Sequence, residues 1–509
     1  MLEKLSMKKV LQRLLICYIL IQPFMEIIYF YQGTLANIGP FTIPTLVRLV
    51  LVIALLLIFF LVHKFSKPSY HLAIYGFVVL IYLVAHLWLT KNALSSLTDG
   101  FTYSVTQEIS YVLRVVFPTL ILFISADTSL EKSTLERITW WLATAISGTI
   151  VVSNLAVFAI ASYDKATMIS ANIFSWFDVV NRPGFMQLAS DGFFLFANSI
   201  SAIMILLLPI ALHYYLRQSS WYKLIILIVM ALSALMIGTR TAIFGSLAAF
   251  IVIPAFYFFA DVPAEESLQW HVKVKKVIPL AAIILVLGLI YPFSPSTGRV
   301  SANDQVNIAT ADRSKASSKQ LLQLREEMQQ QPKQAKRLAQ NYLDTHFDVR
   351  GTYGNVVSAT NPIDKYPELW IDVLTWNAPD QVNFRKIEKA NVDLLKQQIV
   401  PPVRLLLGIS FVRINFFIFN YERDFINQFY TLGLLGIVLF ILPFVLLCLY
   451  LAGKFCFKKQ NWTVENFAYF FSFALFFGAA YLTGNVLDSI TAGSLVAFFM
   501  GQNYRNYRV

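Results

Sequence analysis

The sequence predicts an all-α integral membrane protein, and three observations carry that prediction. Of the 509 residues, 57% are hydrophobic and only 14% are charged, whereas a soluble domain carries about 25% charged residues. The apolar residues fall into long runs, many of them near the ~20 residues that a helix needs to cross a bilayer. Lysine and arginine gather in the short loops between these runs, as topology signals do.

We expect about twelve transmembrane helices, because a bilayer core without water forces spanning segments to be helical. The first expected span ends near residue 31, and a cytoplasmic amino terminus follows from the basic residues ahead of it. The run 221–260 is too long for one span, so Gly238-Thr239-Arg240-Thr241 is expected to form a tight hairpin within it. The other expected spans are 43–62, 71–90, 107–125, 138–161, 193–215, 277–293, 428–452, 466–483 and 486–501.

These spans divide the chain into three parts. Residues 1–293 hold the first nine helices, 294–427 form a large, mostly helical extracytoplasmic loop, and 428–509 hold the last three helices. Within the loop, the apolar stretch near 403–420 contains Arg404 and Arg413. If it crossed the membrane, the lysines after residue 452 would lie outside, so we expect a re-entrant or interfacial segment.

Both termini are expected in the cytoplasm, because positive charge marks every predicted inner loop. These loops carry Lys64, Lys67, Lys132, Arg137, Arg217, Lys223, Lys273, Lys275, Lys276, Lys454, Lys458 and Lys459. The short outer loops 32–42 and 484–488 contain no lysine or arginine. Because the net charge of +12 is distributed in this way, we expect it to report topology rather than nucleic-acid binding.

Ionisable residues in the predicted spans are candidates for function, because charge within hydrocarbon is costly. Glu26, Arg48 and Arg114 lie in spans and Arg240 lies in the hairpin, all toward the expected outer face. Arginines at that depth suit the anionic headgroup of an outer-leaflet lipid, since guanidinium binds phosphate in a bidentate manner. The structural alternative is that Glu26 and Arg48 form an ion pair and that the other arginines extend to the interface.

Three local patterns resemble one family. They are the hairpin Gly238–Ala242, the stretch Phe196-Ala197-Asn198 after Arg182, and the segment Glu422–Gly436, which ends in Gly433-Leu434-Leu435-Gly436. Together they resemble the O-antigen ligases and Wzy-type polysaccharide polymerases. The chain departs from the ligase pattern, because Glu422 and Arg423 stand where ligases carry histidine and asparagine.

The resemblance implies a glycosyltransferase with a GT-C-like membrane fold in the bacterial cytoplasmic membrane, active on the outer face. Its donor would be an undecaprenyl-diphosphate-linked glycan and its acceptor a second glycan, with neither metal nor cofactor. The enzyme would also contact membrane lipids. The resemblance leaves open whether a chain-length regulator binds the extracytoplasmic loop. The sequence likewise has no histidine or cysteine cluster with metal-ligand spacing.

On this resemblance, the reaction needs a base for the acceptor hydroxyl and cations for the leaving diphosphate. We expect Glu422 to be the base, with Asp424 as its alternate or orienting partner. Arg240 and Arg385 are the expected diphosphate ligands, and a second group of cations comprises Arg182, Arg114 and Arg48. The structural alternative for Glu422 and Asp424 is that they only favour the start of the helix near Phe425.

The predicted function is polymerisation of lipid-linked oligosaccharide repeat units into a cell-surface polysaccharide. Two alternatives stay open at this point. One is a ligase that moves a lipid-linked glycan to a lipid, teichoic or protein acceptor. The other is a flippase for the same glycan, although flippases usually show repeat-related halves and no repeat is visible in this sequence.

Overall fold

The structure is a computed structural model, and it describes most of the helical part of the chain. The described residues are 2–30, 37–38, 41–64, 66–94, 101–102, 104–178, 180–194, 196–259, 270–298, 323–324, 326–334, 337–338, 341, 401–408, 410–411, 413–414, 417–418 and 423–508. The chain forms two compact units. Unit 1 comprises Met1–Val78, Ser110–Arg299 and Leu439–Val509, and unit 2 comprises Val79–Ile109 and Val300–Val438.

The structure confirms an all-α integral membrane protein. Among the described residues, nine helical segments are long and apolar enough to cross a membrane. The long helices are α1 (Leu2–Phe30), α2 (Ile43–His63), α3 (Lys67–Leu94), α4 (Val105–Asp127), α5 (Lys132–Leu155), α7 (Ala197–Arg217), α8 (Trp221–Ile237), α9 (Arg240–Phe259), α10 (Trp270–Ile290), α18 (Asp424–Gly436), α19 (Leu442–Phe457), α20 (Val464–Leu482) and α21 (Ile490–Arg508). In the count of nine, α18 and α19 form one continuous segment. The helices α8, α20 and α21 are not among the nine.

Two predicted spans differ from the helices that form. The span expected at 138–161 is too long, because α5 ends at Leu155 and Val157 has a positive φ of 52°. Ile160–Ala161 is instead the strand β4, which pairs with β5 (Asp164–Met168). The span expected at 428–452 lies within one membrane-length segment, Asp424–Phe457, but the helix is irregular, because Gly433 has φ 68° inside α18 and a π-helix, η6 (Ile437–Ile441), precedes α19.

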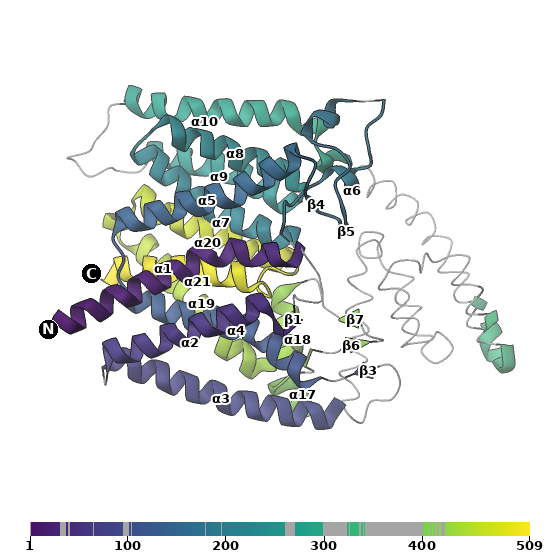
Figure 1. Cartoon of the computed structure of the whole chain (residues 1–509). Coiled ribbons are helices and arrows are strands. Elements are labelled where there is room, and N and C mark those ends of the chain that lie inside the picture. Colours follow the sequence, from purple (N-terminus) through teal and green to yellow (C-terminus); the bar gives the residue numbers. More distant parts are fainter. Residues whose placement is uncertain are drawn as a thin grey trace. The chain divides into compact units, whose positions relative to one another are not determined.

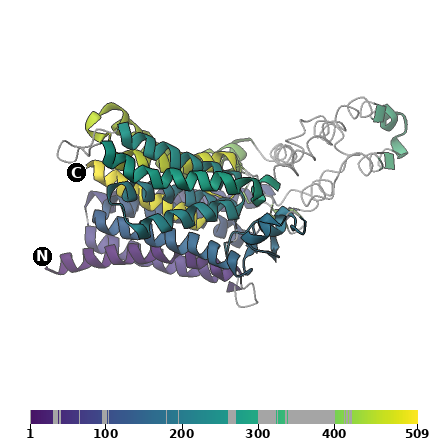
Figure 2. The ribbon, with the colours of Figure 1, turned by 90° about the horizontal axis from the view of Figure 1, so that it is seen from above.

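The centre of unit 1 is α7, whose apolar window is completely buried. It contacts α5, α8, α9, α20 and α21, so it lies inside a bundle of other helices (Figures 1 and 2). A glycine sets the close approach of α9, because a Cβ atom added to Gly245 would lie 2.6 Å from Cγ2 of Ile205. The position of α9 therefore depends on a residue without a side chain.

Both chain termini lie at one end of unit 1 (Figure 1). Basic side chains join the helix ends there. Lys132 pairs with Glu465 at 2.8 Å, and the buried Lys223 pairs with Glu136 at 2.6 Å. Nζ of Lys276 donates to the carbonyl of Leu216 at 2.7 Å. At the opposite end lie the β1–β2 hairpin (Asn37–Ile38 and Phe41–Thr42), the β4–β5 hairpin and the short helix α6 (Phe185–Leu188).

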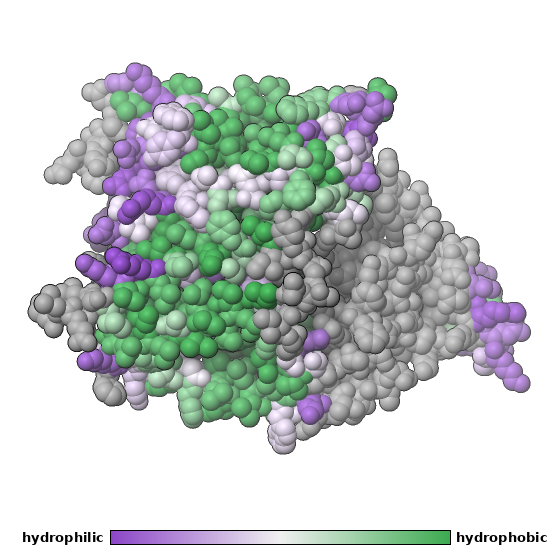
Figure 3. Space-filling view, viewed as in Figure 1, coloured by the Kyte–Doolittle hydropathy of each residue, from purple (hydrophilic) through white to green (hydrophobic). Residues whose placement is uncertain are grey.

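The outer surfaces of the helices are hydrophobic, as expected for contact with lipid. On α2 the exposed large side chains are Val50, Ile53, Leu57 and Leu61, which recur at the spacing of one helix face. On α10 they include Ile278, Leu285, Val286 and Leu289. The space-filling view shows this hydrophobic surface over the helices, with hydrophilic residues toward their ends (Figure 3).

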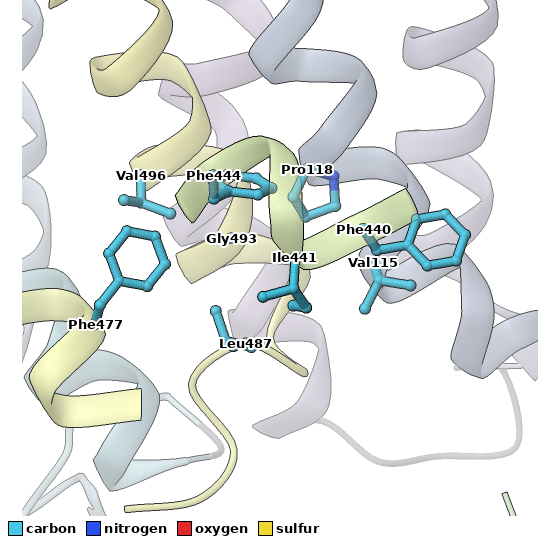
Figure 4. A pocket seen from close by; sticks show the side chains of 9 residues that line it. All are labelled: Val115, Pro118, Phe440, Ile441, Phe444, Phe477, Leu487, Gly493 and Val496. Atoms are coloured by element: carbon cyan, nitrogen blue, oxygen red, sulfur yellow. The ribbon is translucent and has the colours of Figure 1, made fainter. Parts of the chain in front are cut away.

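A second close contact joins α4 and α21 in unit 1. A Cβ atom on Gly493 would lie 2.6 Å from Cγ of Pro118, which is inside α4. Beside this contact is a cavity of about 20 Å³, lined by Pro118, Gly493 and apolar residues such as Phe440 and Phe477 (Figure 4). Its lining is almost entirely apolar, so it offers a water molecule few hydrogen-bond partners. It belongs to the packing of the bundle.

Substitution of Gly245 tests the contact between α7 and α9. We expect Gly245→Leu to lower the free energy of unfolding by about 1–3 kcal/mol, because it forces an extra side chain into a packed interface. The measurement is thermal unfolding of the detergent-solubilised protein. Gly148→Leu in α5 is the control, because an added Cβ there meets nothing within 4 Å. Equal stability of both variants would show that the α7–α9 contact is not close.

Candidate functional site

The predicted hairpin between α8 and α9 forms, and it is held by side chains from distant parts of unit 1. Gly238 ends α8 with φ 75°, a conformation that favours glycine. Its carbonyl oxygen accepts hydrogen bonds from Oη of Tyr163 and Oγ of Ser296, each at 2.8 Å. We call the set Tyr163, Arg182, Gly238–Arg240, Ser294 and Ser296 the hairpin corner.

Arg240 is the first residue of α9 in this corner. Oγ1 of Thr239 accepts a hydrogen bond from the Ala242 amide at 3.1 Å and so caps the helix. The hydroxyl groups of Thr239 and Ser201 are 2.6 Å apart, which ties the cap to α7. The Arg240 side chain is exposed, and it makes no hydrogen bond or ion pair with any residue that the structure describes. Its charge therefore adds to the positive N-terminal end of a helix dipole.

Arg182 reaches the same corner from the loop before α6. Its Nη2 donates to the carbonyl oxygen of Ser294 at 3.1 Å, two residues from the Ser296 that bonds Gly238. The loop is ordered by Asp178, whose Oδ1 accepts the amides of Val180 and Asn181. The Asn181 amide is the main cause that lowers the pKa of Asp178. The segment Ser294–Ser296 thus connects Arg182 with the hairpin that carries Arg240.

Arg48 is instead fixed by protein partners. Its side chain is 2% exposed and donates to Gln22 at 2.9 Å, to Thr491 at 2.7 Å and to Glu26 at 3.3 Å. These contacts link α2, α1 and α21. The ion pair between Glu26 and Arg48, which the sequence left as an alternative to a ligand role, is present in the structure.

Arg114 lies elsewhere in unit 1, on α4. Its Cζ atom is 5.8 Å from the ring centroid of Tyr111, within reach of a cation–π interaction. Oη of Tyr111 donates to the buried carboxylate of Asp488 at 3.2 Å. Arg114 is therefore associated with α4 and the loop before α21, and it does not belong to the hairpin corner.

Asp424 lies in unit 2 as the first residue of α18, and it is 1% exposed. It begins a buried polar stripe on one helix face, since Asp424, Asn427, Gln428 and Thr431 follow the i, i+3, i+4, i+7 spacing. Glu422 and Arg385, the other two residues expected in the site, lie outside the described residues.

Unit 2 also contains a buried pair that the sequence reading missed. Nε2 of His86 on α3 lies 2.6 Å from Oε1 of Glu108 on α4, and both side chains are fully buried. Nδ1 of His86 bonds the Leu407 carbonyl at 2.8 Å, so that nitrogen carries the proton. Oε2 of Glu108 accepts the Phe411 amide at 2.7 Å. The only sign of this pair in the sequence was that His86 and Glu108 are two ionisable residues in or beside apolar runs, 22 positions apart.

The expected re-entrant stretch near 403–420 is described in part. It includes the six-residue helix α17 (Pro401–Leu406) and the antiparallel strands β6 (Arg413–Ile414) and β7 (Phe417–Ile418), with β3 (Phe101–Thr102) beside β6. The hairpin shows that the chain reverses there. Its depth in the membrane stays a prediction.

Two glycines allow α17 and α18 to meet in unit 2. Gly408 and Gly433 have φ of 81° and 68°, and a Cβ atom on either would lie 2.4 Å from a backbone atom of the opposite segment. Gly433 belongs to the Gly433–Gly436 pattern noted in the sequence. The pattern therefore has a structural reason, because any side chain at Gly433 would separate the two backbones.

Replacement of Arg48 tests its structural role. We expect Arg48→Ala to lower the free energy of unfolding by about 3–5 kcal/mol, because it leaves a largely buried Glu26 without its counter-ion. The double variant Arg48→Met with Glu26→Gln should regain part of that loss, as uncharged residues need no partner. Thermal unfolding in detergent measures both. An Arg48→Ala protein as stable as wild type would show that the ion pair contributes nothing.

The comparison with known families supports the resemblance seen in the sequence. The family model described as "O-antigen ligase like membrane protein" matches residues 8–504, nearly the whole chain. Neither the curated proteins nor the solved structures gave a match. The match includes the hairpin corner, α18 and all the long helices except the first residues of α1 and the last residues of α21. The chain therefore belongs to the O-antigen ligase-like family of membrane proteins.

Proposed function

We propose that this membrane protein polymerises undecaprenyl-diphosphate-linked oligosaccharide repeat units on the outer face of the bacterial cytoplasmic membrane. The family supports a membrane enzyme of glycan ligation or polymerisation, and the finer assignment is ours. The observation that carries it is the hairpin corner, where an exposed arginine stands at a helix N-terminus with a second arginine beside the same loops. Both features favour an anion such as a diphosphate.

The proposed reaction is a metal-independent glycosyl transfer of the GT-C type. The bond between the anomeric carbon and the lipid diphosphate breaks, and a new bond forms between that carbon and an acceptor hydroxyl oxygen. The hydroxyl proton passes to a carboxylate base, and the lipid diphosphate leaves with the bonding electrons. In this proposal the arginines of the hairpin corner stabilise the negative charge of the leaving diphosphate.

Arg240 and Arg182 are the cations that we assign to the diphosphate, with Arg385 as a further candidate. Arg48 is satisfied by Gln22, Glu26 and Thr491, and we therefore assign it a structural role. Arg114 likewise remains with Tyr111. Arg240 has no protein partner in the described part of the chain, and Arg182 is kept because its hydrogen bond to Ser294 ties it to the hairpin corner.

Glu422 remains the proposed base, and Asp424 is the proposed orienting partner. Asp424 is buried at the first turn of α18, where the helix dipole stabilises a carboxylate. A carboxylate fixed at this position can orient the neighbouring groups. The replacement of the ligase histidine by Glu422 favours polymerisation over transfer to a lipid, teichoic or protein acceptor, which stays the second candidate.

The proposed topology places the active site outside and both termini in the cytoplasm. The basic residues Lys132, Lys223 and Lys276 lie at the end of unit 1 that carries both termini. Excess positive charge is typical of the cytoplasmic side. The hairpin corner belongs to the opposite end, beside β4–β5 and α6 (Figure 1).

A polymerisation assay with purified protein and its lipid-diphosphate oligosaccharide tests the proposal. We expect longer lipid-linked glycans from wild type, and a loss of about 10²–10³-fold in rate for Arg240→Ala, because a cation is removed from the leaving group. Glu422→Gln should lose activity, and Arg240→Lys should recover only part of it, because lysine lacks the bidentate fork. Arg137→Ala is the control, since Arg137 is exposed at the other end of unit 1.

Three other outcomes would contradict this proposal. Full activity of folded Arg240→Ala would remove the hairpin corner from the site. Transfer only when a separate lipid, teichoic or protein acceptor is supplied would establish the ligase. Movement of intact substrate across a vesicle membrane, without elongation, would establish the flippase.

A further inference from the structure

An apolar groove opens on the side of the helix bundle of unit 1, between α8, α9 and α10. Its volume is about 180 Å³. Small residues create the space, because Ala231 and Ala234 on α8 and Gly288 on α10 line it. An added Cβ at Gly288 meets nothing within 4 Å. The opposite wall is α9, where Phe244 and Leu247 are 57% and 40% exposed.

The groove leads to the hairpin corner along one face of α9. Its lining residues Ile243, Phe244 and Leu247 lie three, four and seven positions after Arg240, which is the spacing of one helix face. Arg240 is therefore the charged residue at the outer end of this face. Tyr291, which follows α10, also lines the groove and precedes by three residues the Ser294 that binds Arg182.

The chemistry of this arrangement fits a ligand with a hydrocarbon tail and an anionic head. A buried apolar cavity of about 150 Å³ is large enough to bind benzene, so this groove can receive a short branched stretch of hydrocarbon. Arg240 continues the groove face of α9, and Arg182 bonds Ser294 just beyond the lining residue Tyr291. Two such cations suit a diphosphate better than a phosphodiester, because the diphosphate offers more charge and more oxygens for bidentate contacts. The occupant that satisfies both ends is a polyprenyl diphosphate.

We propose that this groove binds the first isoprene units of the polyprenyl chain while Arg240 and Arg182 bind the diphosphate. The inference rests on the proposed function, and it adds the place at which the lipid part of the donor is held. The tail would lie on α9 between α8 and α10, in contact with the bilayer. The sugar would then lie beyond the hairpin corner, on the outer side.

A photoreactive probe tests the groove directly. The protein in lipid nanodiscs is illuminated with a benzophenone-bearing prenyl diphosphate, and labelled peptides are identified by mass spectrometry. We expect labels within 240–250 and 280–291. Gly288→Phe, which fills the groove, should reduce this labelling at least tenfold. Gly76→Phe on α3 is the matched control, because Gly76 is also an exposed helical glycine with nothing within 4 Å of an added Cβ, and it should label as wild type does.

The headgroup is tested with the same probe. Arg240→Ala should reduce labelling by the prenyl diphosphate but not by the corresponding prenyl alcohol, because only the diphosphate uses the cation. A photoreactive phosphatidylglycerol serves as the competing lipid. If it labels the same peptides and excess prenyl diphosphate does not displace it, the groove is a general acyl-chain groove and the proposal is overturned.

Failure of the groove and failure of the proposed function give different results. Normal glycan elongation by a folded Gly288→Phe protein, with labels outside 240–250 and 280–291, would overturn the groove and leave the function standing. Labelling of the groove in wild type without any elongation would support the lipid site and overturn the polymerase. Loss of both labelling and elongation in Gly288→Phe, but not in Gly76→Phe, is the result expected here.

Discussion

A polar or charged group within hydrocarbon must find a partner in the protein, and this requirement governs the rest of the structure. It explains why the apolar runs form helices, and why Arg48 is surrounded by Gln22, Glu26 and Thr491. It also explains the compact contacts of His86 with Glu108 and Leu407 in unit 2. Arg240, by contrast, is exposed at the start of α9, and it is the cation that we propose for the ligand.

The hairpin corner is held in place by the central helix of unit 1. Thr239 bonds Ser201 on α7, and Gly245 lets α9 approach α7 closely. Gly238 is fixed from outside the hairpin by Tyr163 and Ser296. The backbone at Arg240 is therefore held rigidly, which reduces the conformational entropy lost when a diphosphate is bound. The same rigidity gives the groove along α9 a defined position relative to that cation.

Hydropathy and charge were sufficient to predict most helices and the hairpin, because both signals are local in the sequence. The glycine at position 238 marked the turn between α8 and α9 correctly. The end of α5 was predicted too late, since Val157 and the β4–β5 pairing interrupt an apolar run that hydropathy alone cannot divide. The break at Gly433 was missed because it depends on the approach of Gly408 from a distant segment.

The site was predicted less completely than the fold, because partners of ionisable residues are set by tertiary contacts. The sequence placed Arg48, Arg114, Arg182 and Arg240 together as candidates. The structure separates them by their partners and associates only Arg182 and Arg240 with the hairpin corner. His86 and Glu108 went unnoticed, because nothing in the sequence shows that α3 and α4 bring them within 2.6 Å.

The central claim is that Arg240 binds a lipid diphosphate, and native mass spectrometry of the purified protein tests it most directly. Wild type and Arg240→Ala are each titrated with undecaprenyl diphosphate and with undecaprenyl monophosphate. The account predicts that the substitution weakens binding of the diphosphate at least tenfold and affects the monophosphate much less. Identical titration curves for the two proteins would contradict it, because the hairpin corner would then have no part in binding the donor.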